Sequence, residues 1–350
     1  MRTVTVNASR IYNIEIECGI LDRAGEMAAK VIKPCTAAIL TDTNVAPLYA
    51  ERLEASLISA GYSPIRFTIE AGEKSKSAES YLSFLNFLAS NRITRSDCIF
   101  ALGGGVVGDL AGFAAATYLR GIRFVQIPTT LLAMVDSSVG GKTAIDLPAG
   151  KNLAGAFYQP DLVLCDIDAL HTLPDHIFRD GCAEVIKYGI LYDPQLFEHL
   201  TANGLDFDRE YVVTRCVELK RDVVADDEFD RDVRQKLNLG HTIGHGIEAS
   251  SHFGVSHGLA VASGIGIVTR AASKNGICSE ETYSQVISTL EHFGLPHRTQ
   301  YTAEDIYKWA LSDKKRSGAT VNLIVPKAIG DCVIIPTATD ELKSFIEAGL

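Results

Sequence analysis

A glycine-rich loop between a strand-like and a helix-like segment most constrains how this chain can fold. Cys98–Leu102 is a short apolar run, and Gly103, Gly105 and Gly108 follow it in the order G-x-G-x-x-G before a helical segment begins. Glycines in such a turn let a pyrophosphate approach the backbone, where the N-terminus of a helix favours negative charge. The loop therefore predicts an α/β domain that binds a nucleotide.

The motif departs from the usual dinucleotide fingerprint. That fingerprint occupies the first βα turn and is followed about 20 residues later by an acidic residue. Here two or three βα units come first, and position 123 is Arg123. Asp42, which ends an earlier strand-like run, is instead the candidate for the ribose hydroxyls. A tight turn that only lets a helix pack closely is the structural alternative.

Strand-like and helix-like segments alternate through the first half of the chain. Helical periodicity marks Ala46–Ser59 and Ala78–Ser90. The alternation is typical of a mainly parallel, doubly wound sheet of the Rossmann type, with ligands at the carboxyl ends of its strands. The strand-like runs are Thr3–Val6, Tyr12–Glu17, Ala37–Thr41, Pro64–Ile69, Cys98–Leu102, Phe124–Ile127 and Leu162–Cys165.

Helical periodicity dominates from about Asp168 onward, with one late pair of strand-like runs, Val321–Val325 and Cys332–Ile335. We therefore expect two domains, an α/β domain over residues 1–166 and a mainly helical one over residues 167–350. The helical segments are Arg179–Leu191, Arg209–Ala225, Leu239–Ser250, Gly258–Asn275, Glu280–Phe293 and Ala303–Ser312.

Composition excludes several classes of protein. The chain has 33 basic and 43 acidic residues, a net charge of -10, which argues against a nucleic-acid or anionic-membrane binder. No apolar run reaches about 18 residues, and the strand-like N-terminus is not a signal peptide. The eight cysteines are scattered without a CxxC pair, a pattern typical of reduced, mostly buried thiols in a cytoplasmic protein.

Polar groups follow other strands of the first half. Glu70–Lys76 and the pair Thr129 and Thr130 each come after a strand-like run. Gly140–Thr143 ends like a P-loop, but the first glycine of that motif is replaced by Asp136, so it is not a Walker A sequence. Lys142 and the pair Lys151–Asn152 predict cations aimed at an anionic ligand, although isolated lysines more often lie on a solvated surface.

All nine histidines lie in the second half of the chain, at or after His171. His241 and His245 are one helical turn apart, and His257 begins the next helical segment. Together with Glu184 they predict a metal site with three protein ligands and one open position, although histidines hydrogen-bonded in a core are the alternative. The sequence H-E-x-x-H is absent, so this is not a zincin-like protease.

In combination, these motifs resemble the 3-dehydroquinate synthase family of sugar-phosphate cyclases over essentially the whole chain. The resemblance is carried by Ala71–Lys76, Gly103–Asp109, Pro128–Asp146, Gly150–Asn152, Glu184–Gly189 and Asn238–Glu248. It implies an NAD-binding domain over residues 1–166, a helical metal- and substrate-binding domain over residues 167–350, a zinc or cobalt ion, and a homodimer.

The resemblance also implies roles for individual residues. Glu184, His241 and His257 would be the metal ligands, and His245 would handle protons. NAD would contact Asp42, Asn44, Glu73, Lys76, Gly104, Gly105, Val106, Val107, Gly108, Asp109, Thr129, Thr130, Lys142, Lys151 and Thr172. An anionic substrate would contact Lys142, Asn152, Lys187, Lys220, Arg234, Asn238, His245 and Lys314 or Lys315.

Two further residues take roles only through the resemblance. Arg120 would reach the phosphate site of a neighbouring subunit, and Asp136 would orient a lysine or the substrate. Without the resemblance, Lys220, Arg234 and the pair Lys314–Lys315 would be assigned to solvated faces, because each lies in a highly charged segment.

The implied reaction converts 3-deoxy-D-arabino-heptulosonate 7-phosphate to 3-dehydroquinate and phosphate in the shikimate pathway. Transient oxidation by NAD would permit β-elimination of phosphate; reduction, ring opening and aldol closure would follow. A metal-dependent alcohol or glycerol dehydrogenase, a sister cyclase and a non-enzymatic sensor are the alternatives. The many cations at substrate positions favour a cyclase.

Overall fold

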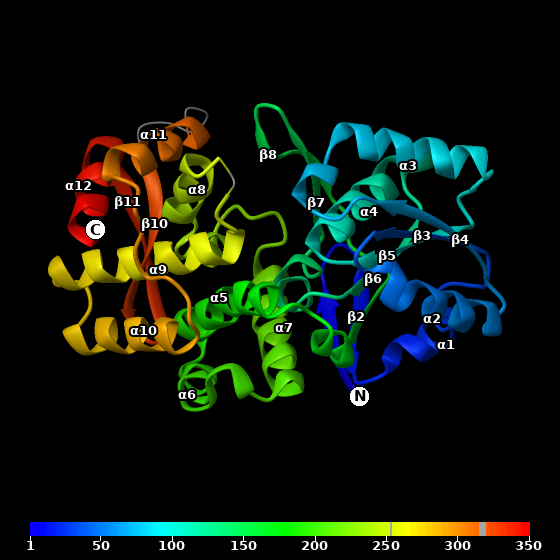
Figure 1. Ribbon diagram of the computed structural model, residues 1–350, viewed down its shortest axis with the longest axis horizontal. Coiled ribbons are helices and arrows are strands. Elements are labelled where there is room, and N and C mark those ends of the chain that lie inside the picture. Colours follow the sequence, from blue (N-terminus) through cyan, green and yellow to red (C-terminus); the bar gives the residue numbers. More distant parts are fainter. Residues whose placement is uncertain (253, 315–319) are drawn as a thin grey trace. The chain divides into compact units, whose positions relative to one another are not determined.

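The computed structural model describes residues 1–252, 254–314 and 320–350, with residues 310–314 described by their backbone alone. The chain forms two compact units (Figure 1). The first comprises Met1–Pro174 and Arg209–Phe229, and the second comprises Asp175–Asp208 and Asp230–Leu350. Among the described residues, the structure has no helix with the length and apolarity needed to span a bilayer.

The first unit is built on a seven-stranded sheet in the order β1-β2-β9-β6-β5-β3-β4. The pair β1 and β2 is antiparallel and the other pairs are parallel, which confirms the predicted mainly parallel sheet. The strands are β1 (Arg2–Asn7), β2 (Ile11–Glu17), β3 (Thr36–Asp42), β4 (Ser63–Ile69), β5 (Cys98–Gly103), β6 (Arg123–Pro128) and β9 (Leu162–Asp166).

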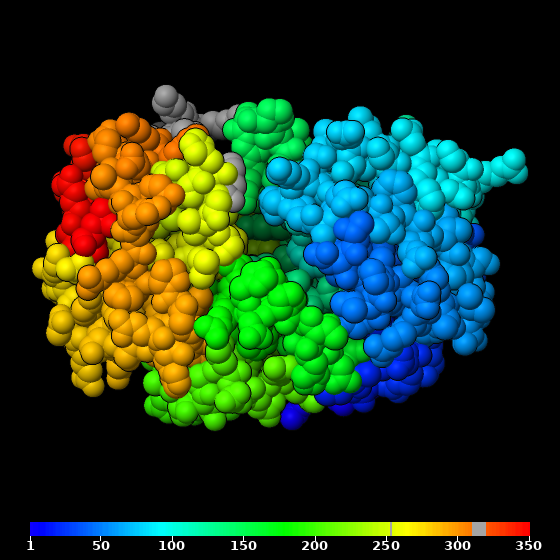
Figure 2. All heavy atoms as spheres, in the orientation of Figure 1, coloured from blue at the N-terminus to red at the C-terminus, as the bar shows by residue number. Residues whose placement is uncertain are grey.

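Helices cover both faces of this sheet, so its central strands are largely apolar. Every residue of β5 is buried, as expected for a parallel strand packed on two sides. Helices α3 (Ala78–Ser90) and α4 (Gly105–Thr117) lie on one side, and α1 (Ala24–Ala29) and α2 (Ala46–Ser59) lie on the other (Figure 1). In the space-filling view, segments coloured blue to cyan form much of the surface of the first unit on the face that is shown (Figure 2).

The strand order contains a topological switch point. From β3 the chain passes through α2 to β4 on one side, and then returns through α3 to β5 on the other side of β3. In doubly wound sheets, ligands bind where neighbouring crossovers diverge, at the carboxyl ends of the strands. Asp42 ends β3 and Gly103 ends β5, so both lie at the expected edge.

An antiparallel hairpin that the sequence patterns did not indicate follows β6. It consists of β7 (Lys142–Leu147) and β8 (Gly150–Phe157), and β7 packs against α4. Glycine permits that close contact, because a Cβ on Gly112 of α4 would lie 2.3 Å from Thr143 Cγ2. The hairpin carries polar and charged residues where a strand pattern would need apolar ones, which hid it from periodicity analysis.

The second unit is mainly helical, as predicted, with one hairpin formed by β10 (Thr320–Ala328) and β11 (Asp331–Ala338). The predicted helix α7 (Arg209–Asp226) forms, but it packs against β1 and β2 of the first unit. The helices of the second unit are α5 (Asp175–Tyr192), α6 (Pro194–Asn203), α8 (His241–Ser250), α9 (His257–Lys274), α10 (Glu280–His292), α11 (Ala303–Lys314) and α12 (Thr339–Gly349).

Helix α9 is the central element of the second unit and contacts α5, α8, α10 and α12. Small residues let its neighbours approach closely. A Cβ on Gly264 would lie 2.0 Å from the carbonyl oxygen of Gly240, and one on Gly258 would lie 1.9 Å from that of Asp180. These glycines therefore bring α8 and α5 close to α9. His241 and His245 lie on α8, and His257 begins α9.

Candidate active site

The glycine-rich loop joins the end of β5 to the start of α4. Gly104 immediately precedes the helix, whose first turn contains Val106, Val107 and Gly108 and carries N–H groups without intrahelical partners. A Cβ on Gly104 would lie 3.0 Å from Thr130 Cγ2, and one on Gly105 would lie 3.2 Å from Ser137 Oγ. A side chain at either position would crowd its neighbour, and the same geometry leaves a helix N-terminus suited to phosphate.

Thr129 lies beside this loop, directly after β6. Its N–H donates to the carbonyl oxygen of Gly103 at 3.0 Å, which ties the ends of the two strands together. Its hydroxyl oxygen is buried and makes no hydrogen bond with the described residues. A buried hydroxyl without a partner costs about 1–3 kcal/mol, so a ligand that hydrogen-bonds there would relieve that cost. The Thr129 hydroxyl thus fits the oxygen-rich phosphates or ribose of a dinucleotide.

Asp42 and Asn44 lie at the switch point, before helix α2. One carboxylate oxygen of Asp42 accepts hydrogen bonds from the N–H groups of Asn44 and Val45, both at 2.9 Å. One turn into α2, the Tyr49 hydroxyl hydrogen-bonds to the hydroxyl of Thr172. The structure therefore brings the predicted ribose residue Asp42 and the distant Thr172 to the same end of α2.

Four predicted cofactor residues and one predicted substrate residue form a charged network in the first unit. Lys76 Nζ lies 2.5 Å from Asp109 Oδ2 and 2.5 Å from Asn152 Oδ1. Lys151 Nζ lies 3.7 Å from Glu73 Oε1. Because Lys151 and Asn152 belong to β8, the unpredicted hairpin is what carries them to the loops after β4 and β5.

Burial shapes the ionisation of this network. Burial would lower the pKa of the Lys76 ammonium, but Asp109 and Glu73 outweigh it and the pKa is raised. Burial raises the pKa of the Asp109 carboxyl, against the attraction of Lys76. Lys76 therefore keeps its positive charge at neutral pH beside the glycine-rich loop.

Lys220 is buried, so its sequence-based assignment to a solvated face was wrong. It is 5% exposed, and its ammonium contacts Asp136 in a short π-helical turn, η4 (Ala133–Ser137). Turns of this kind often lie at functional sites. Asp136 therefore contacts a lysine, while its role at the site stays a prediction. Lys142 is exposed at the first position of β7.

Glu184, His241 and His257 come together in the second unit. One ligand atom from each lies within 4.8 Å of the others. Oε1 of Glu184 lies 3.3 Å from Nε2 of His241 and 3.4 Å from Nε2 of His257. Glu184 is fully buried, and neither of its oxygens makes a well-aligned hydrogen bond with the described residues, although ion-pair partners surround it. Two imidazoles and a buried carboxylate form a donor set that fits zinc or cobalt.

The electrostatics of the cluster favour an ionised carboxylate. Burial would raise the pKa of Glu184, but Lys187 and His241 hold it well below its usual range. Burial would also lower the pKa of His257, but hydrogen bonds to Glu184 and Glu248 raise it to about 10. In the absence of a cation the cluster thus takes up protons, and a divalent ion would replace them.

Of the other substrate residues expected in the second unit, Lys187 and His245 lie beside members of this cluster. Lys187 is 1% exposed and pairs with Glu184 on the same face of α5. The His245 ring centre lies 5.5 Å from that of His241, and His245 is exposed. Arg234 is also 1% exposed, so its assignment to a solvated face was wrong too. Arg234 and Asn238 share a 3-10 helical segment, η7 (Val233–Asn238), that leads into α8.

Some predicted residues lie elsewhere. Arg120 precedes β6, whereas Thr129 follows it, so Arg120 lies at the opposite edge of the sheet from the glycine-rich loop. Leu119, Arg120 and Gly121 all have positive φ angles of 50°, 68° and 120°, a strained turn. Lys314 ends α11 with its side chain outside the described part of the chain, and Lys315 lies outside the described residues.

Three residues that support the site were not assigned a role from the sequence. Tyr49 holds Thr172, as described above. Asp146 accepts a hydrogen bond from the N–H of Asn152 at 2.8 Å and thereby fixes its backbone. Glu248 contacts His257. A signal for Glu248 was present, because it lies seven residues after His241 and so shares its helix face.

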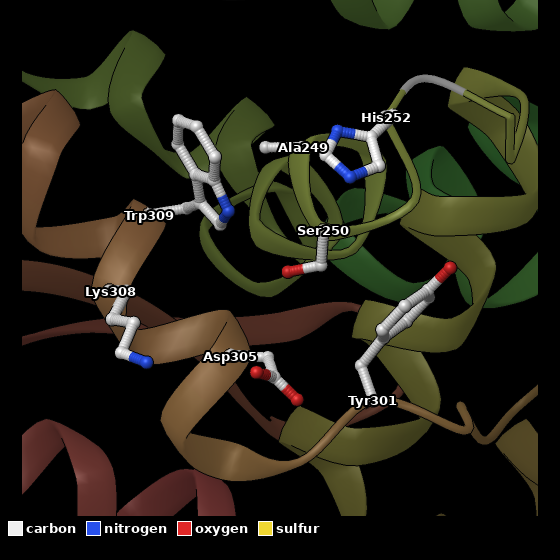
Figure 3. Close-up of a pocket in the computed structure, with 7 residues that line it drawn as sticks. All are labelled: Ala249, Ser250, His252, Tyr301, Asp305, Lys308 and Trp309. Atoms are coloured by element: carbon white, nitrogen blue, oxygen red, sulfur yellow. The ribbon is translucent and has the colours of Figure 1, made fainter.

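A shallow depression lies beyond the end of α8 in the second unit. Figure 3 shows His252 and Ser250 from the α8 side facing Tyr301, Asp305 and Trp309. Asp305 already accepts hydrogen bonds from the N–H and hydroxyl of Thr302. The depression contains none of the residues predicted to bind cofactor, metal or substrate, and we assign it no ligand.

Comparison with known proteins covers both halves of the chain. Residues 66–180 match the family described as 3-dehydroquinate synthase N-terminal, and residues 181–316 match 3-dehydroquinate synthase C-terminal. The 3-dehydroquinate synthase of Enterococcus faecalis is 42% identical over 98% of both chains, and that of Pelobacter propionicus is 44% identical over 99% of both.

A solved structure has the same fold. The 2-epi-5-epi-valiolone synthase of Streptomyces hygroscopicus, with NAD+ and Zn2+ bound, superposes with a TM-score of 0.90 at 25% identity, covering 100% of this chain and 98% of that one. Matches to both family domains, near-complete coverage of the relatives and the grouping of the residues above lead to one assignment: this chain belongs to the 3-dehydroquinate synthase family.

Proposed function

We propose that this chain converts 3-deoxy-D-arabino-heptulosonate 7-phosphate to 3-dehydroquinate and phosphate, with NAD as a recycled cofactor and a divalent metal ion. The observation that carries the proposal is the grouping of His241 and His257 around the buried carboxylate of Glu184 in a chain of this family. The reaction is a carbon–oxygen lyase step of the shikimate pathway, and it has no net redox change.

The first unit would hold NAD. The N-terminus of α4 and the Thr129 hydroxyl suit its phosphates, and Asp42 suits a ribose. Bound there, NAD would supply reversible hydride transfer with a secondary alcohol. Lys76, kept charged by Asp109, would attract the pyrophosphate and set its position at the loop. Zinc and NAD+ in the Streptomyces relative support this pair of cofactors.

The second unit would hold the metal through Glu184, His241 and His257. When bound, the metal polarises a substrate hydroxyl and makes its oxidation easier. Lys187 and Arg234 would bind the anionic groups of the substrate, and Asn238 would orient its hydroxyls. The exposed imidazole of His245 would accept or donate a proton at its ring nitrogens.

The remaining polar residues of the first unit, two lysines and an asparagine, would also bind substrate oxygens. Lys142 and Asn152 sit on the β7–β8 hairpin, and Lys220 is held in place by Asp136. These three residues would hold the open-chain intermediate in a reactive conformation. The aldol closure would then not need a dedicated base for every step.

We also propose that the chain forms a cytoplasmic homodimer in which Arg120 acts in the site of the other subunit. Its position at the edge of the sheet opposite the glycine-rich loop supports a role outside its own site. Mixing an inactive Arg120→Ala subunit with an inactive His257→Ala subunit would restore part of the activity if Arg120 acts in the other subunit. A mixture without activity would contradict that role.

The function is tested by incubating the purified protein with the heptulosonate phosphate, a divalent metal and catalytic NAD. Release of phosphate without accumulation of NADH supports the proposal. NADH produced in proportion to substrate would favour a dehydrogenase, the alternative considered from the sequence. Turnover of a different sugar phosphate but not this one would favour a sister cyclase.

A further inference from the structure

The two ring nitrogens of His257 face two different carboxylates. Its Nε2 lies 3.4 Å from Oε1 of Glu184, the carboxylate of the metal cluster. Its Nδ1 lies 3.4 Å from Oε2 of Glu248, on the other side of the ring. A metal that binds Nε2 would therefore leave the Nδ1 proton to Glu248.

Glu248 lies in a buried position. Glu248 is 2% exposed, and a buried carboxylate is costly unless it is hydrogen-bonded or paired. It lies on the same face of α8 as His241, and α8 packs against α9, which His257 begins. The close approach of the two helices depends on Gly244, where a Cβ would lie 3.1 Å from the backbone of Ala260.

The second ligand histidine is oriented in a different way. Nδ1 of His241 lies 3.1 Å from the carbonyl oxygen of Leu239, so its ring is held by the backbone of its own segment. His257 is the first residue of α9, and its Nδ1 faces the carboxylate of Glu248 instead of a backbone carbonyl group. Ligand histidines usually donate their second N–H to a carboxylate or carbonyl group, which fixes the tautomer and raises their basicity.

We propose that Glu248 is a positioning residue that accepts a hydrogen bond from Nδ1–H of His257 and so directs the Nε2 lone pair toward the metal. This inference rests on the proposed function, because it presupposes a metal at Glu184, His241 and His257. The alternative role for Glu248 is that of a metal ligand, since His245, Glu248 and His257 also form a group that could hold a cation. The test must therefore separate a positioning residue from a ligand.

The experiment compares metal-free wild type with Glu248→Gln, which keeps the size of the side chain but removes its charge. Zinc affinity is measured by competition with a chromophoric chelator, and the visible spectrum is recorded after loading with Co2+. We expect a zinc affinity about 10–100-fold weaker and an altered Co2+ spectrum, with the circular dichroism of the metal-free protein unchanged. Glu248→Asp, which restores the carboxylate, should recover part of the affinity even if the glutamine variant folds poorly.

Two variants calibrate the result. Glu291→Gln is the matched control, because Glu291 pairs with His297 at 3.1 Å on the surface of the same unit, and it should leave zinc affinity unchanged. Glu184→Gln should abolish binding. Zinc affinity of Glu248→Gln within twofold of wild type would overturn the inference, and so would a loss as complete as that of Glu184→Gln, which would make Glu248 a ligand.

The two proposals fail in distinguishable ways. Wild type that binds no metal would overturn both of them. Wild type that binds zinc but does not convert the heptulosonate phosphate would overturn the proposed function, while the affinity of Glu248→Gln would still decide the role of Glu248.

Discussion

Lys220 Nζ lies 2.6 Å from Oδ1 of Asp136 and 2.7 Å from the carbonyl oxygen of the same residue. The two residues are 84 positions apart, and the contact fastens helix α7 to the π-helical turn η4. For a lysine that is 5% exposed, the carboxylate and the carbonyl group replace hydrogen bonds to water.

Asp136→Ala should therefore destabilise the protein. Removing the carboxylate leaves a buried ammonium with a carbonyl partner, and we expect a loss of about 3 kcal/mol in the free energy of unfolding, measured by urea denaturation. Asp22→Ala is the control, because its pair with Arg52 is exposed and should contribute less than about 1 kcal/mol. Equal effects of the two substitutions would contradict the role given to the Lys220–Asp136 contact.

His257→Ala should remove bound metal and activity while leaving the fold intact. The substitution takes one of three ligands from the cluster, and its side chain is one-third exposed, so packing loss is small. Metal content by elemental analysis and circular dichroism of the metal-free protein measure the two effects. His171→Ala, which removes an imidazole that is 63% exposed, serves as the control. Full metal occupancy in His257→Ala would show that the ligand set is different.

Asp97 should make the stability of the first unit depend on pH. Its carboxylate accepts hydrogen bonds from Thr94 N–H and hydroxyl, both at 2.7 Å, and from Thr36 N–H at 2.9 Å. Burial would raise the pKa of Asp97, but these hydrogen bonds hold it below its usual value of about 3.9. The folded state therefore binds fewer protons, so the stabilisation is complete above that value and is lost as pH falls through the folded pKa.

The corresponding substitution is Asp97→Ala. We expect it to cost about 1–3 kcal/mol at pH 7, with the difference from wild type shrinking below pH 4. Urea denaturation at several pH values measures this, with Asp331→Asn, an exposed residue, as control. A difference that stays constant from pH 7 to pH 3 would exclude the hydrogen-bonded carboxylate as its source.

The cysteines should differ sharply in reactivity. Cys18 is exposed and Cys35 half-buried, whereas the other six are buried. Burial raises the pKa of the Cys332 thiol to about 12, so it carries almost no thiolate at neutral pH. Titration with a thiol reagent should label Cys18 and Cys35 in the native protein and all eight only after unfolding. Rapid native labelling at Cys332, found by mass spectrometry, would contradict the packing around β11.

Sequence patterns located most of the fold because long periodic segments carry their own signal. The predicted strands and helices appear within a few residues of their expected ends. Helix α6 was not predicted, although Asp193 and Pro194 mark its start as a cap and first residue. The β7–β8 hairpin could not be found from periodicity, because its stability comes from packing on α4 rather than from alternating apolar residues.

The candidate site was predictable in its residue types but not in its contacts. The spacing of His241 and His245 indicates a shared helix face, yet choosing His257 over His245 as the ligand came only from family resemblance. The burial of Lys220 and Arg234 depends on groups distant in the sequence, so charged segments alone placed both on a solvated face. Whether such a charged side chain is buried depends on its tertiary contacts, and a local sequence pattern does not contain that information.

Helix α7 has a consequence for how the protein is made. The first unit needs Arg209–Phe229 to cover β1 and β2, but a ribosome completes the strands of the sheet well before it synthesises that segment. While residues of the second unit emerge, the nascent sheet therefore has an uncovered apolar face. During that interval the exposed face can bind chaperones or aggregate. An expression fragment that stops at Pro174 would keep this defect permanently.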